Sequence, residues 1–167
     1  MHSFLTHRHL QAFEPMSPRD FGALLASARA LQRSAQASTT QPLLRGKNLG
    51  LMCEAADEAD AALFHRAAAE LGAHVAHIRP SLSELSTAQE VQHTARLLGR
   101  LYDAVECQGI AAALVLRVGD HAGIPIYNAL ASARHPTARL AEMLGGDASP
   151  ADNRRFVLQA VLLDTIA

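Results

Sequence analysis

The sequence has no tryptophan, and aromatic residues fill only 4% of its 167 positions. It has two cysteines, too few for the disulfide framework of a small secreted domain. Cys53 and Cys107 both fall in apolar runs typical of strands, so we expect buried thiols rather than a disulfide. No apolar run approaches the roughly 20 residues of a membrane-spanning helix, and the N-terminus lacks the apolar core of a signal peptide. These absences favour a cytoplasmic protein without a membrane segment.

The sequence also lacks an excess of charge of one sign. Its 15 basic and 16 acidic residues are interspersed and give a formal net charge of −1. A nucleic-acid-binding surface needs concentrated basic residues, so we expect no nucleic acid partner. No glycine-rich nucleotide loop, metal-ligand cluster or catalytic triad pattern occurs, so we expect neither a cofactor nor a metal. His2, His7 and His9 are interpreted as part of a solvated tail, with a transition-metal site as the alternative.

What the sequence does contain is a regular alternation of strand and helix signals, with 49% hydrophobic residues to build one core. Short apolar runs predict strands at 49–53, 75–78, 104–107 and 124–127. Capping residues and helical periodicity predict helices at 18–36, 57–71, 87–101, 110–122, 135–144 and 150–166. This order predicts an α/β fold: a single domain with a four-stranded parallel sheet and helices on both faces.

The segment after the first predicted strand is acidic where a phosphate site would be expected. A helix N-terminus that follows a strand attracts anions through its free N–H groups and its dipole. Here the first turn carries Asp57, Glu58 and Asp60. We expect these carboxylates to cap the helix themselves and to repel a phosphate.

Five short motifs follow one another in order between residues 43 and 144. They are Arg45-Gly46-Lys47, Glu70-Leu71-Gly72-Ala73-His74, His93-Thr94-Ala95-Arg96-Leu97-Leu98, Pro125-Ile126-Tyr127-Asn128 and His135-Pro136-Thr137. Together they resemble the N-terminal, carbamoyl-phosphate-binding domain of ornithine and aspartate carbamoyltransferases, with the ornithine branch nearer. The resemblance implies the fold of that domain and a homotrimer, because the family's first domain builds the trimer interface.

The resemblance is weakest at the positions that bind substrate and act in catalysis in the family. Family members open the first crossover helix with Ser-Thr-Arg-Thr-Arg, which holds the phosphate, and the matching residues here are 57–61, Asp-Glu-Ala-Asp-Ala. A like charge at about 4 Å costs roughly 4 kcal/mol at an effective dielectric of about 20, which exceeds the favourable helix dipole. Gln108 replaces the family's Arg after the third strand, and Ala138 replaces the Gln of its His-Pro-x-Gln motif. Only His135 remains, at the position that hydrogen-bonds the carbamoyl oxygen in the family.

The last segment resembles a part of the family that lies far along its chain. Family members continue beyond the His-Pro helix into a second domain, whereas residues 152–163 here resemble the family's C-terminal helix, which returns to pack on the first domain. We therefore expect residues 1–150 to form a carbamoyltransferase N-terminal-like domain. Residues 151–167 are expected to form a helix that packs back on it, beside the N-terminal helix.

Two classes of function remain open. The first is a catalytically inactive carbamoyltransferase-like protein that does not bind carbamoyl phosphate. It would act as an oligomeric scaffold or regulatory subunit, with itself, a complete carbamoyltransferase or another pathway protein as partner. The second is a small-molecule binder or enzyme of changed specificity. Its candidate ligand-binding residues are Asp57, Glu58, Asp60, Gln108, His135 and Ala138, with His135 as a vestige of catalysis. Carbamoyl transfer to an amino acid is a remote third.

Overall fold

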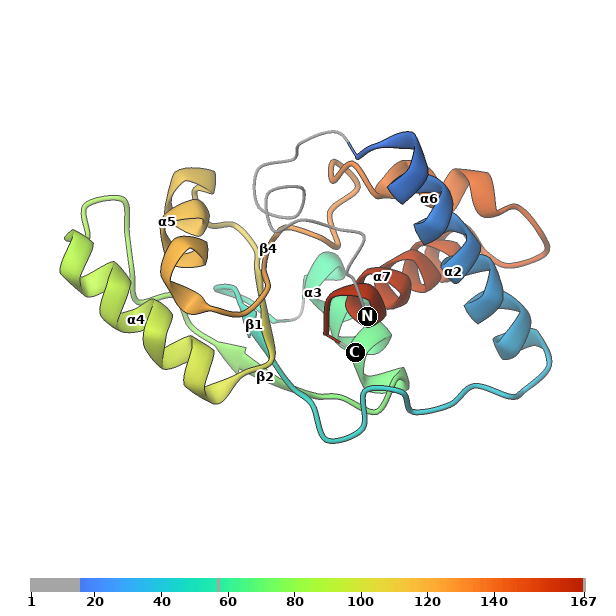
Figure 1. Cartoon of the computed structure of the whole chain (residues 1–167), viewed down its shortest axis with the longest axis horizontal. Coiled ribbons are helices and arrows are strands. Elements are labelled where there is room, and N and C mark those ends of the chain that lie inside the picture. The colour runs from blue at the N-terminus through green and yellow to red at the C-terminus, as the bar shows by residue number, and fades with distance from the viewer. Residues whose placement is uncertain (1–15, 57, 167) are drawn as a thin grey trace.

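The computed structural model describes residues 16–56 and 58–166, and they form a sheet with helices packed on both of its faces (Figure 1). The strands are β1 (Asn48–Met52), β2 (His74–Ile78), β3 (Ala104–Cys107) and β4 (Ile126–Asn128). The helices are α2 (Pro18–Gln36), α3 (Ala59–Glu70), α4 (Ala88–Leu101), α5 (Ala112–Ala122), α6 (Ala138–Leu144) and α7 (Pro150–Ile166). The predicted fold class is confirmed.

All strand pairs are parallel, and the order across the sheet is β2-β1-β3-β4. The chain therefore leaves β1 towards one edge and leaves β3 towards the other. In open parallel sheets, such a reversal creates a crevice between the carboxyl ends of the two central strands, where ligands commonly bind. Here the crevice lies between the ends of β1 and β3.

The capping signals in the sequence form as expected. The Ser17 side chain accepts a hydrogen bond from the Asp20 amide at 3.1 Å, and Pro18 opens α2. Thr87 and Glu90 form both halves of a capping box at the start of α4, and Thr87 Oγ1 accepts from the Glu90 amide at 3.2 Å. Because these residues satisfy the first free amides locally, the helix starts could be located from sequence alone.

Three helix starts and one strand lie two residues or more from their predicted positions. Helix α3 begins at Ala59 rather than 57. Helix α5 begins at Ala112 rather than 110, and α6 begins at Ala138 rather than 135, because residues 129–137 form successive turns. Strand β4 lies at Ile126–Asn128 rather than 124–127, after the left-handed Gly123 (φ 71°) that ends α5. The shift at α6 matters most, since it places His135 in a turn rather than in a helix.

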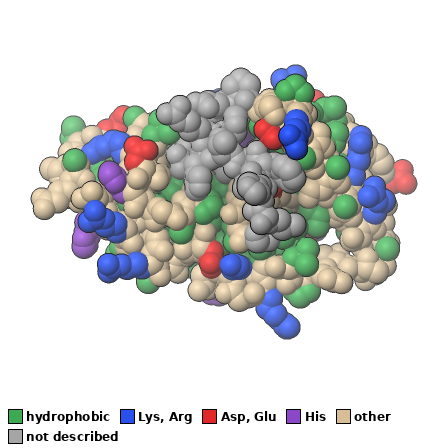
Figure 2. Space-filling view, viewed as in Figure 1, with side chains coloured by type: hydrophobic (Ala, Val, Ile, Leu, Met, Phe, Trp, Pro, Cys, Tyr) green, Lys and Arg blue, Asp and Glu red, His purple; other side chains and the backbone are tan. Residues whose placement is uncertain are grey.

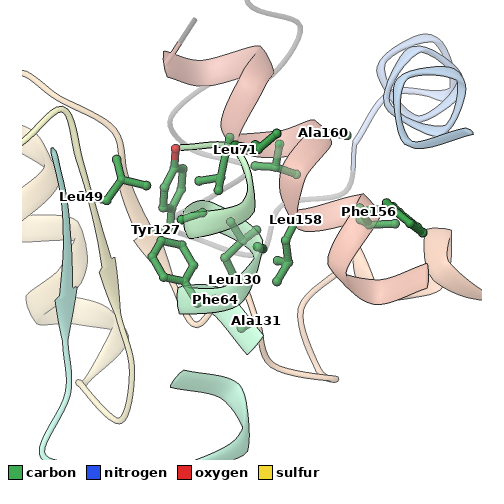
Figure 3. Packing of buried hydrophobic residues seen from close by; sticks show 14 of the residues in the cluster. Leu49, Phe64, Leu71, Tyr127, Leu130, Ala131, Phe156, Leu158 and Ala160 are labelled. Carbon is green, nitrogen blue, oxygen red and sulfur yellow. The ribbon is translucent and has the colours of Figure 1, made fainter. Parts of the chain in front are cut away.

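Two clusters of buried apolar side chains lie on opposite faces of the sheet. The α5 core joins the sheet to α4 and α5, and it contains Met52, Val91, Ala95, Leu98, Val105, Cys107, Leu114, Val115, Val118, Ala122 and Ile126. The α7 core is larger and joins the other face to α2, α3, α6 and α7; Figure 3 labels Leu49, Phe64, Leu71, Tyr127, Leu130, Ala131, Phe156, Leu158 and Ala160 among its members. Both cysteines are buried and free, as expected.

Helix α7 lies between α3 and the pair formed by α2 and α6 (Figure 1). Every residue from Asn153 to Leu162 is buried, so the helix does not lay a single apolar stripe on the domain. It is tied to the sheet through Tyr127, whose hydroxyl lies 2.6 Å from Thr165 Oγ1, while Thr165 in turn donates to the Val161 carbonyl. The predicted packing of the first described helix, α2, against the last one is confirmed.

None of the helices described is both long and apolar enough to cross a membrane. Figure 2 shows acidic and basic side chains interspersed over the described part of the visible face.

Candidate functional site

The carboxyl ends of β1, β3 and β4 bring most of the residues predicted for a site to one side of the molecule. Glu58 and Asp60 lie at the start of α3, after β1, and both are exposed. Glu58 occupies the N-cap position, yet its side chain makes no capping hydrogen bond. The expectation that this carboxylate caps α3 is therefore wrong. Asp57, the third acid of the predicted group, lies outside the described residues.

Gln108 lies just after β3 and is buried, on the same side of the strand as Glu106. Its Nε2 donates to Glu106 Oε1 at 3.4 Å. Glu106 is fully buried, and burial raises the pKa of its carboxyl to about 8, despite the lowering effects of Gln108, the amides of Ala131 and Leu130, and Arg154. At neutral pH this carboxyl is therefore mostly protonated and does not supply a full negative charge.

His135 is buried within the turns before α6, with 2% of its surface exposed. Its Nδ1 lies 2.8 Å from Thr137 Oγ1 and 3.2 Å from the Thr137 amide nitrogen. The amide can only donate, so Nδ1 is the acceptor and the neutral ring carries its proton on Nε2. The imidazole is held in one orientation by its own turn.

Arg154 of α7 joins these groups. Its guanidinium donates to Thr137 Oγ1 at 3.1 Å, to the Leu130 carbonyl and to the Ser132 carbonyl at 3.4 Å. Burial lowers the pKa of Arg154 to about 10, although the charges of Glu106 and Asp60 oppose this shift. One cation from α7 thus fixes the turns around His135 and lies near enough to Glu106 and Asp60 for their charges to act on it.

Glu106 and Arg154 are the two residues of this cluster that the sequence analysis missed as site residues. Each was interpreted only as part of a strand or of a helix. A signal was present for both: an acid within the apolar run Ala104–Cys107 and an arginine within a helix of mostly apolar residues. Buried charges are rare unless they are paired, so these two could have been expected to face each other.

The remaining predicted position is Ala138, which begins α6 and is half-buried. Its methyl group offers no hydrogen bond to a ligand. Among the described residues, no group of three or more His, Cys, Asp and Glu side chains is arranged to hold a metal ion. The cluster therefore consists of acids, one side-chain amide, one imidazole and one buried guanidinium, and this guanidinium is already bonded to protein groups.

Comparison with known proteins places this arrangement in a family. Residues 8–145 match the family described as aspartate/ornithine carbamoyltransferase, carbamoyl-P binding domain. The chain belongs to the aspartate/ornithine carbamoyltransferase family. Among its relatives, the ornithine carbamoyltransferase of Actinobacillus pleuropneumoniae serotype 5b is 37% identical over 140 residues, which cover 84% of this chain and 42% of that one. The ornithine carbamoyltransferase of Cutibacterium acnes is 36% identical with the same coverage.

The aligned part is thus less than half the length of these curated carbamoyltransferase relatives. Solved structures agree on the fold. An ornithine carbamoyltransferase from Burkholderia thailandensis superposes with a TM-score of 0.68 at 21% identity, covering 82% of this chain and 47% of that chain. The catalytic subunit of M. jannaschii aspartate transcarbamoylase superposes with a TM-score of 0.60 at 21% identity, covering 77% and 42%.

Proposed function

We propose that this chain is a carbamoyltransferase-like domain that does not bind carbamoyl phosphate, has no catalytic activity and acts through assembly, as an oligomeric scaffold or a regulatory subunit. The observation that carries the proposal is the chemistry at the carboxyl end of the sheet. Gln108 and His135, at positions where the family contacts its substrate, are buried and bonded to neighbouring protein groups. Glu58 and Asp60 present carboxylates where the family presents threonine hydroxyls, and Ala59 stands between them where the family has an arginine.

The local charges oppose a phosphate. Arg154 is the cation within this cluster, and its guanidinium is buried and already bonded to Thr137 and two carbonyls. Glu58 and Asp60 add two full negative charges at the start of α3, whereas the helix dipole supplies about half a positive charge there. A dianion placed at this point would be repelled.

Apolar side chains at the surface support the assembly half of the proposal. Leu85, in the 81–86 loop, is 94% exposed, and Leu97 and Leu101 on α4 are 48% and 55% exposed. In the family, the loop after the second strand approaches the next subunit. Exposed apolar groups of this size are commonly covered in an oligomer. We propose residues 1–150 as the family-like unit and 151–167 as the helix that completes it.

The test is a calorimetric titration of the full chain with carbamoyl phosphate up to millimolar concentration, where we expect no heat of binding. A variant with Glu58→Thr, Ala59→Arg, Asp60→Thr and Gln108→Arg restores family residues, and it should gain measurable anion affinity while keeping its circular dichroism spectrum. A micromolar dissociation constant for the unmodified chain would overturn the proposal and favour an active carbamoyltransferase.

The oligomeric state is tested by light scattering coupled to size exclusion, which should show a trimer of about 53 kDa, three times 17.8 kDa. A strict monomer would remove the scaffold role.

A further inference from the structure

A cavity of about 250 Å³ lies where the chain reverses direction across the sheet. Its walls come from the segment after β1, the loop after β2 and the segment between β3 and α5. The lining residues are Glu54, Pro80, Leu82, Ser83, Glu84, Gly109, Ile110, Ala111 and Leu114. The crevice between the ends of β1 and β3 is the position at which open parallel sheets usually bind ligands.

The cavity adjoins a narrow recess that is lined only by apolar side chains. Pro80, Leu82, Ile110 and Leu114 line both spaces. The recess continues towards the α5 core, where Met52, Cys107, Val115 and Val118 complete its lining. The recess has a volume of about 10 Å³, room for a group the size of one water molecule, so a ligand in the cavity would turn an apolar end towards it and a polar group towards the mouth.

The two ionisable side chains that line the cavity are both acidic. Glu54 comes from the segment after β1 and Glu84 from the loop after β2, and neither forms an ion pair with another described residue. The first turn of α5 also meets the cavity, and it has no side-chain cap. Its dipole contributes about half a positive charge, which two carboxylates outweigh. Arg117 of α5 is bonded to the Ser86 carbonyl and does not line the cavity, so the balance of the lining charges favours a cation.

The loop wall is held in place by its own hydrogen bonds. The Ser83 amide donates to Ser86 Oγ at 3.0 Å, and the Leu85 amide donates to Ser83 Oγ at 3.2 Å. Arg117 of α5 donates to the Ser86 carbonyl at 2.9 Å and so ties the loop to the opposite wall. A preformed cavity binds more tightly because little order must be imposed on binding.

We infer that this cavity binds a small organic cation: a primary amine or guanidinium group carried on a short hydrocarbon chain. The cationic head lies between Glu54 and Glu84, and the chain lies in the cavity along Leu82 and Leu114. The cavity faces the α5 core, whereas Gln108 and Glu106 lie on the α7 side of the sheet. The inference therefore does not depend on whether carbamoyl phosphate binds.

The experiment compares three probes with one hydrocarbon skeleton: 3-methylbutylamine, 3-methylbutanol and 3-methylbutanoate. Each is titrated into the full chain while amide chemical shifts are followed by NMR. The amine should bind with shifts at residues 109–114 and 82–84, and its affinity should fall as salt is added. Methylamine, which lacks the chain, should bind more weakly.

Matched variants test whether Glu54 and Glu84 bind the cationic head group of the ligand. Glu54→Gln and Glu84→Gln should each weaken amine binding about three- to fivefold, as expected for exposed ion pairs, without changing the fold. Glu142→Gln, an exposed acid on α6, serves as the control and should leave the affinity unchanged. Equal binding of the alcohol or the carboxylate, unchanged affinity in both cavity variants, or no amine binding would each overturn the inference. Titration of the same sample with carbamoyl phosphate tests the proposed function separately.

Discussion

The face of the sheet covered by α4 and α5 and the face covered by α2, α3, α6 and α7 bury different chemistry. No buried polar side chain comes from α4 or α5 within the described residues, and the core that these helices build with the sheet is apolar. The opposite face buries Glu106, Gln108, His135 and Arg154 beside its leucines. An apolar core tolerates many sequences of similar volume, whereas a buried polar cluster requires each partner to be present. The α7 face is therefore the one on which single substitutions should have the largest effects.

Among single substitutions, removing Arg154 should destabilise the α7 face of the sheet most. The Arg154→Ala variant removes three hydrogen bonds to the turns around His135 and leaves their acceptors, two of them buried, without this donor. We expect a loss of about 3–5 kcal/mol in the free energy of unfolding, measured by urea denaturation, because each buried acceptor left without a partner costs about 1–3 kcal/mol. Arg100→Ala, at an exposed position on α4, is the control and should stay within about 0.5 kcal/mol of the unmodified chain. Similar losses in the two variants would contradict the comparison.

The pH dependence of stability gives a second test of the comparison between the two faces of the sheet. Because Glu106 has a pKa of about 8 in the folded chain and 4.5 as its ordinary value, the folded state binds more protons between these pH values. The free energy of unfolding should therefore decrease as pH rises from about 4.5 to 8 and level off above that, with a slope of at most about 1.4 kcal/mol per unit from this group.

The matched variant is Glu106→Gln, which keeps the shape and cannot ionise. It should be about as stable as the unmodified chain near pH 5 and more stable by a few kcal/mol near pH 8. The lowered pKa of Asp152 acts only below its ordinary value of 3.8, outside this window. Parallel stability curves for the two proteins would show that Glu106 is ionised in the folded state.

A smaller effect tests the apolar face. A Cβ atom at Gly99 of α4 would lie 2.0 Å from the Ala122 carbonyl oxygen at the end of α5, so the two helices must separate in Gly99→Ala. We expect a loss of about 1–3 kcal/mol by urea denaturation. At Gly22 of α2 a Cβ meets nothing within 4 Å, and Gly22→Ala should instead stabilise the chain by about 0.5–1 kcal/mol. A neutral Gly99→Ala would show that the α4–α5 contact is loose.

The sequence predicted the order and type of every described strand and helix, because capping residues such as Thr87 and Ser17 act locally. It did not predict the turns at 129–137. Two features of these turns, their hydrogen bonds to Arg154 and the burial of His135, depend on α7, which lies about 20 residues further along the chain.

The candidate site also had a part that the local sequence predicted and a part that depended on contacts between distant residues. Glu58 and Asp60 could be placed at the start of α3 from the strand–helix pattern. The proximity of Glu106 to Arg154, the direction of the Gln108 side chain and the cavity lined by Glu54 and Glu84 could be seen only in the folded structure. Periodicity reports which face of an element is apolar, and it carries no information on which polar groups meet across elements.

The hydrogen bond between Tyr127 and Thr165 makes tyrosine fluorescence a probe of how α7 packs on the sheet. The sequence has two tyrosines and no tryptophan to collect their excitation energy. Tyr127 belongs to the α7 core, and Tyr102 packs against the α5 core, so each face of the sheet holds its own emitter. Tyr127 loses its hydroxyl partner when α7 leaves the sheet, whereas Tyr102 does not. Fluorescence from Tyr102→Phe and Tyr127→Phe proteins would thus follow the loosening of the two faces separately, without an attached dye.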